Sequence, residues 1–73
     1  MSTRKQIKYI HEGRYVAEVD VELIDDETEW TPYLSLEDAE KLDDVRAALA
    51  RGDVAAASKL ARVFTLQPVA VSR

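Results

Sequence analysis

The sequence predicts an α+β fold, namely a small β-β-α-α-β domain in which a three-stranded sheet has a helical hairpin packed on one face. Three observations predict it. Apolar and charged residues alternate in residues 15–23, helical spacing with capping residues follows in residues 35–52, and alternation returns in residues 63–71. Because 73 residues are the size of one small domain, we expect residues 1–73 to form a single domain.

The clearest element is the strand predicted between Tyr15 and Leu23. Alternation with a period of two gives a strand one dry face and one wet face. The dry face contains Tyr15, Ala17, Val19, Val21 and Leu23. The wet face contains three carboxylates, Glu18, Asp20 and Glu22, and the apolar residues Val16 and Ile24 also point to this side. The pattern therefore indicates architecture and surface charge, and it indicates no chemistry.

The preceding strand, residues 4–10, is expected to form a hairpin with it across a turn at residues 11–13. A three-residue loop with a left-handed glycine pairs Ile7 with Ala17, and a five-residue loop gives the same faces, so the exact register stays open. A two-residue loop at residues 12–13 is disfavoured because it places lysine and glutamine on the dry face. The predicted dry face of the first strand contains Ile7 and Tyr9, and its wet face contains Gln6, Lys8 and Ile10.

Two helices are predicted after an acidic connection at residues 25–29. Ser35 caps the first helix, with Asp38 in the glutamate position of a capping box, and Gly52 ends it. Asp53 caps the second helix, which runs to about residue 62. Their inward positions are Ala39, Leu42, Val45, Ala48, Leu49, Val54, Ala57, Leu60 and Ala61. The third strand follows at residues 63–71, where Pro68 restricts it to an edge.

The net charge of −4 is unevenly distributed along the chain. Residues 1–14 have a net charge of +3, residues 15–44 of −11, and residues 45–73 of +4. A strongly acidic middle segment repels phosphate backbones and attracts basic surfaces, so nucleic acid is an unfavourable first partner and a basic protein a favourable one. With no cysteine, no signal-peptide pattern and no apolar stretch of about 20 residues, we expect a cytoplasmic protein without a membrane span.

Catalytic and metal-binding readings find little support in the sequence. His11 is the single histidine and lies at a turn, with no serine or cysteine nucleophile placed beside it. The acidic run that starts at Asp25 does not match a calcium loop, because the sixth position holds Trp30 and the twelfth Leu36. We therefore expect no enzyme activity, no catalytic residues, no metal site and no cofactor.

Three large aromatic residues, Trp30, Tyr33 and Phe64, are expected to contribute to the small core. Trp30 or Tyr33 is also the candidate for a hydrophobic anchor at the edge of the acidic segment. A core of this size stabilises a fold by only a few kcal/mol, about the lower limit for a single domain, so we expect a homodimer. The predicted partner-binding residues are Glu18, Asp20, Glu22, Asp25, Asp26, Glu29, Trp30 and Tyr33.

Three stretches, residues 8–19, 30–39 and 61–71, together resemble a group of short, uncharacterised bacterial proteins. They read KYIHEGRYVAEV, WTPYLSLEDA and ARVFTLQPVAV. That group is similar in size and gene setting to components of toxin–antitoxin modules, which implies an antitoxin-like protein but supplies no site residues.

The leading hypothesis is therefore a non-enzymatic interaction protein whose acidic surface docks a basic partner, such as a toxin-like nuclease. The alternative is a small DNA-binding regulator that uses a basic face. Its candidate residues are Arg4, Lys5, Lys8, Lys59, Arg62 and Arg73. The helix pair around Gly52 matches helix-turn-helix spacing only in part, because Ser58 stands where a branched apolar residue is expected.

Overall fold

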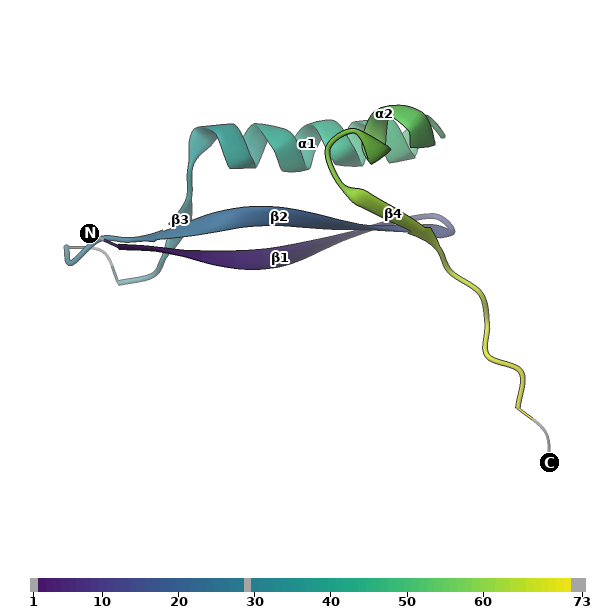
Figure 1. Ribbon diagram of the computed structural model, residues 1–73, viewed down its shortest axis with the longest axis horizontal. Helices are drawn as coiled ribbons and strands as arrows, with labels where there is room; N and C mark the ends of the chain where they lie inside the picture. The colour runs from purple at the N-terminus through teal and green to yellow at the C-terminus, as the bar shows by residue number, and fades with distance from the viewer. Residues whose placement is uncertain (1, 29, 72–73) are drawn as a thin grey trace.

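The computed structural model describes residues 2–28 and 30–71 and shows a mixed α+β fold in which an antiparallel sheet is packed against helices (Figure 1). Within these residues four strands form one sheet, so the predicted three-stranded sheet gains a short strand. The elements in chain order are β1 (Ser2–Glu12), β2 (Tyr15–Asp25), β3 (Tyr33–Leu34), α1 (Leu36–Ala50), α2 (Val54–Ser58) and β4 (Arg62–Thr65).

Strand β2 is the centre of the sheet. β1 pairs with it along its whole length, from Ser2 opposite Asp25 to Glu12 opposite Tyr15. On the other edge of β2, β4 pairs with residues 15–18 and β3 with residues 23–24. Both helices lie on one side of this sheet (Figure 1). The predicted helical hairpin on one face is therefore observed, while its second helix ends at Ser58 rather than near residue 62.

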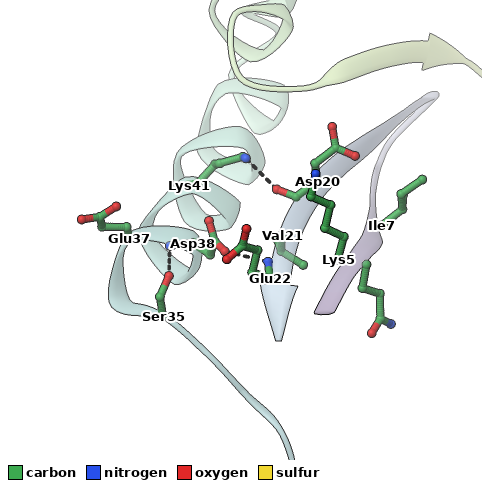
Figure 2. Close-up of a pocket in the computed structure, with 10 residues that line it drawn as sticks. Lys5, Ile7, Asp20, Val21, Glu22, Ser35, Glu37, Asp38 and Lys41 are labelled. Atoms are coloured by element: carbon green, nitrogen blue, oxygen red, sulfur yellow. Dashed lines mark hydrogen bonds between the residues drawn. The ribbon is translucent and has the colours of Figure 1, made fainter. Parts of the chain in front are cut away.

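The gap between β3 and β4 exposes main-chain groups of β2 at residues 19–22, and α1 supplies partners for two of them. The Glu22 N–H donates to Oδ2 of Asp38 at 2.8 Å, and the Nζ of Lys41 donates to the Asp20 carbonyl at 2.6 Å (Figure 2). Unpaired strand groups are costly unless they find such partners. Because Asp38 and Lys41 lie three positions apart on one helix face, they replace part of a neighbouring strand.

The helix N-caps are the residues predicted from the sequence. The Ser35 hydroxyl accepts from the Asp38 N–H at 3.1 Å, and the Asp53 carboxylate accepts from the Ala56 N–H at 3.0 Å. In a full capping box the Asp38 side chain would return to the Ser35 N–H. Here that carboxylate accepts from β2 instead, so it joins the helix to the sheet.

The core lies between the hairpin and the helices and consists of small and branched side chains. In the described part of the chain eight hydrophobic residues are buried, namely Ile10, Ala17, Val19, Val21, Val45, Ala48, Leu49 and Ala57. The buried face of β2 is the predicted one, and so are three inward positions of α1. Leu60, predicted inward, is exposed because α2 ends before it.

The predicted faces of β1 are wrong. The hairpin has a two-residue turn at Gly13-Arg14, with a φ of +58° at Gly13 alone, as in a type II′ turn. This turn pairs Ile10 with Ala17, so Ile10 is buried at 4% exposure while Ile7 and Tyr9 lie on the opposite side at 43% and 65%. Gln6 and Lys8 share the helix side with Ile10. They are tolerated there because β1 is an outer strand whose side chains reach solvent beside α1.

The aromatic residues lie outside the core, contrary to the expectation from the sequence. Trp30 is 100% exposed, Phe64 is 51% exposed and Tyr33 is 43% exposed. Phe64 pairs with Val16 and Tyr33 with Ile24, and both positions belong to the side of the sheet without helices. The core between the helices and the sheet is instead built mainly from valine, leucine, isoleucine and alanine, with Tyr15 as the aromatic residue packed against it.

Candidate functional site

Two surfaces stand out on the described residues. We define the acidic end as the loop from Asp25 to Pro32 with Tyr33 and the first turn of α1. We define the uncovered face as the side of the sheet opposite the helices.

The acidic end forms because β2 and β3 pair beside the loop. Ile24 lies opposite Tyr33 and Leu23 opposite Leu34, which closes residues 25–32 into one connection at one end of the molecule, near the start of α1 (Figure 1). Asp25, Asp26, Trp30 and Tyr33 are thereby brought together, and Glu37 of α1 follows directly. Glu29 was predicted to belong to the same site, but it lies outside the described residues.

Hydrogen bonds order part of this loop. Oδ1 of Asp26 accepts from both the N–H and the hydroxyl of Thr28, each at 3.0 Å. These two bonds stabilise the carboxylate and hold the pKa of Asp26 below its usual value. Asp25 lies 3.4 Å from Nε of Arg4, an exposed pair of the kind that contributes little to stability. The loop thus presents ionised carboxylates around a tryptophan that is open to solvent.

The other predicted carboxylates, Glu18, Asp20 and Glu22, lie on the uncovered face of β2, and Glu22 adjoins the acidic end because its N–H donates to Asp38. Arg62 of β4 sits opposite Glu18 and binds two of them. Its Nε donates to Glu18 at 3.0 Å, and its Nη1 and Nη2 donate to the two oxygens of Asp20, each at 3.0 Å. Glu22 lies opposite Lys5 in the register. The three acids of β2 are therefore partly neutralised by basic residues from distant parts of the chain.

Arg62 lowers the pKa of Asp20 by hydrogen bonding to its carboxylate, and the two carboxylates raise the pKa of Arg62. Because the folded-state pKa of Asp20 is depressed, this interaction stabilises the fold above the ordinary aspartate pKa of about 3.9 and is lost as the pH falls through the lower, folded value. We expect Arg62→Ala to move the pKa of Asp20 upward, toward its ordinary value. A carbonyl-detected NMR titration of both proteins checks this, with Arg46→Ala as the matched control that leaves Asp20 unchanged.

The hollow shown in Figure 2 has a volume of about 970 Å³ and lies between the middle of the hairpin and the first half of α1. Its lining has both charges, with Lys5 and Lys41 near Asp20, Glu22 and Asp38. Asp38 and Lys41 are occupied by the β2 backbone, as described above. The hollow is thus the place where helix side chains bond to the open edge of β2.

His11 lies beside the hairpin turn, and its Nε2 is 2.8 Å from the Gly13 carbonyl oxygen. The imidazole is exposed and joins the turn locally. Among the described residues no group of three or more histidine, cysteine, aspartate or glutamate side chains is arranged to hold a metal ion. No helix in the described ranges is long and apolar enough to cross a membrane.

Sequence reasoning missed the acids of α1 as surface residues. Glu37, Glu40, Asp43 and Asp44 are all exposed, and Asp43 pairs with Arg46 at 3.3 Å. The sequence does indicate this exposure, since none of these four acids belongs to the apolar stripe of the helix. At the opposite end of the molecule, Arg14 occupies the hairpin turn and Arg51 ends α1, where it pairs with Asp53 at 3.5 Å (Figure 1).

Comparison with protein-family models, with curated proteins and with solved structures finds no match to this chain.

Proposed function

We propose that the protein is a non-enzymatic interaction protein that binds a basic protein partner through its acidic end. The supporting observation is Trp30, which is fully exposed within a loop of carboxylates. Large aromatic residues are normally withdrawn from water, and tryptophan is the residue most enriched among binding hot spots. A tryptophan held in solvent beside ionised aspartates suits a partner with an apolar pocket rimmed by lysine or arginine.

The acids around Trp30 supply attraction at a distance. Asp25, Asp26, Glu27 and Glu37 lie at the end of the molecule opposite the hairpin turn, and Arg4 pairs with one of these acids, Asp25. Such a field orients a basic partner and raises its association rate, while the tryptophan supplies affinity after contact. An antitoxin-like role, with a basic toxin-like nuclease as the partner, agrees with a site in which carboxylates attract the partner and Trp30 supplies affinity.

Glu18 and Asp20 have a smaller part in this proposal than we expect from the sequence alone. Their carboxylates are occupied by Arg62, and a basic partner would have to displace that guanidinium to reach them. The partner site proposed here is therefore centred on Asp25, Asp26 and Trp30 with Tyr33 at its edge.

The DNA-binding alternative receives less support from the arrangement of its residues. Register places Arg4 and Lys8 on the helix side of β1 and Lys5 on the uncovered face. Arg62 is bound to two carboxylates, and Arg73 lies outside the described residues. Recognition of a phosphate backbone needs basic side chains along one surface, and these residues do not share one.

The test compares capture of basic proteins from native lysate by the wild type, by Trp30→Ala and by Asp25→Lys/Asp26→Lys. We expect both variants to weaken the binding of the same partner by about 30-fold or more, because a hot-spot residue contributes at least about 2 kcal/mol. Asp43→Lys/Asp44→Lys is the charge-matched control on the middle of α1. A partner that is captured equally by the wild type and both variants contradicts the proposed site.

A further inference from the structure

The uncovered face carries apolar side chains that no described residue of the same chain covers. At one end of the hairpin Phe64 lies beside Val16, and at the other Tyr33 lies beside Ile24. Ile7 and Tyr9 lie between them on β1. Four of these residues are 43% to 65% exposed, although both helices pack on the opposite side (Figure 1). Apolar groups gathered on one face in this way mark an interaction surface.

The segment after β4 adds to this surface. The Leu66 N–H donates to the Arg14 carbonyl at 2.7 Å, and the chain then leaves the sheet on the side away from the helices (Figure 1). Its apolar side chains are largely in solvent, with Leu66 at 50%, Val69 at 86% and Val71 at 76% exposure. An extended apolar segment directed past an uncovered apolar face provides a second contact element for the same occupant.

We propose that this face is covered by a second copy of the chain, in a dimer related by a two-fold axis. The described core has eight buried residues, three of them alanine, and a radius of gyration of 15.2 Å exceeds the ~11 Å expected for a compact domain of this length. A domain this small gains stability by oligomerisation when one core is insufficient. A second copy of the chain is available as the partner wherever the first is made.

The size of the surface agrees with a dimer that uses both elements. An 11-residue strand is about 37 Å long, and three neighbouring strands are about 14 Å wide, so the flat footprint of the face is at most ~500 Å². A stable interface buries about 800 Å² on each partner. The apolar segment of residues 66–71 adds to the accessible surface that such an interface buries.

The charges on the face favour a copy of itself over a basic partner. Glu18 and Asp20 are already bound to Arg62, and the remaining acid, Glu22, lies beside Lys5 on the neighbouring strand. A two-fold axis along the strands places β1 of one copy over β2 of the other. Lys5 of each copy then faces Glu22 of the second copy, so the mixed charges complement one another. Tyr33 belongs to both surfaces, whereas Asp25, Asp26 and Trp30 lie in the loop beyond the residues that pair β2 with β3 and remain open to their own partner.

The experiment measures oligomeric state by sedimentation equilibrium of the full chain between about 1 and 100 μM. We expect a dimer of twice 8.2 kDa, and we expect Tyr9→Glu and Phe64→Glu each to weaken the dimer by about a hundredfold. Leu36→Glu is the matched control, because it changes an exposed leucine on the helix side and leaves the dimer unchanged. Circular dichroism of each variant at high concentration separates loss of the dimer from loss of the fold.

A second readout uses the absence of cysteine from the chain. Ile7→Cys is expected to give a covalent dimer with a short bis-maleimide reagent, whereas Leu36→Cys gives none. A wild type that is monomeric at 100 μM overturns the proposal, and so does a dimer that both glutamate variants leave intact. Neither result affects the acidic end, since Trp30→Ala tests that site and is expected to leave the dimer unchanged.

Discussion

Val19→Asp is expected to leave the chain unfolded at neutral pH. Val19 has no exposed surface and is one of the two largest fully buried side chains of the described core, together with Val45. A carboxylate at this position would lie among aliphatic side chains without a hydrogen-bond donor, at a cost of about 4 kcal/mol or more. A domain of this size has only about 3 to 5 kcal/mol of stability, so the substitution removes the folded state.

Circular dichroism and guanidinium titration at fixed protein concentration check this expectation. The matched control is Leu36→Asp, which introduces the same carboxylate at the 74% exposed first position of α1, where the helix dipole favours a negative charge. We expect the control to unfold at the wild-type midpoint. A cooperative transition for Val19→Asp at the same midpoint would show that this side of β2 faces solvent.

Ile10→Ala is expected to lower the free energy of unfolding by about 3 kcal/mol, because it removes three buried carbons and leaves a cavity under the helices. Ile10 is 4% exposed and lies opposite Ala17. The same change at Ile7, which is 43% exposed on the uncovered face, is expected to cost less than about 1 kcal/mol. Chemical unfolding of both variants at low protein concentration gives the comparison.

This pair of variants distinguishes the two possible orientations of β1. Equal losses, or a larger loss for Ile7→Ala, would support the orientation expected from the sequence, in which Ile7 faces the helices. The difference between the two values is more reliable than either alone, because both variants delete the same atoms from the same strand.

The orientation of β1 shows where prediction from sequence fails. β2 has one clearly apolar parity, and its buried face was correctly predicted from alternation alone. β1 has isoleucine at odd and at even positions, so alternation alone does not identify its covered side. The prediction depended on excluding Gln6 and Lys8 from that side. That exclusion does not hold on an outer strand, where a long polar side chain keeps its head in water. The turn at Gly13-Arg14 then fixes the register.

Local signals predicted both helix starts, because an N-cap depends on neighbouring residues, whereas the end of α2 was predicted too late. Ser35 and Asp53 accept the hydrogen bonds that their positions predict. The aromatic residues were wrongly expected in the core because their size was considered without the geometry of the layers. With helices on one side only, the alanine and valine positions fill the single core, and Trp30 and Phe64 remain outside it.

The candidate site could be predicted in part. The acids and Trp30 of residues 25–30 follow one another in the chain, so their grouping was visible in the sequence. The neutralisation of Glu18 and Asp20 was not, because Arg62 is more than 40 residues away and reaches them only through the register of β4. The net charge counted along residues 15–44 therefore overstated the negative field at the sheet, and it understated the negative field at the loop and α1.

The central claim is that the sheet has a covered side, which includes Ile10, and an uncovered side, which includes Ile7 and is free for another chain. The most direct measurement is a methyl NOE experiment on the isoleucine, leucine and valine side chains in solution. The structure predicts contacts from the Ile10 methyl groups to helix side chains of the same buried cluster, which includes Val45 and Leu49 of α1, and none from Ile7 to that cluster. NOEs from Ile7 to α1, with none from Ile10, would contradict it.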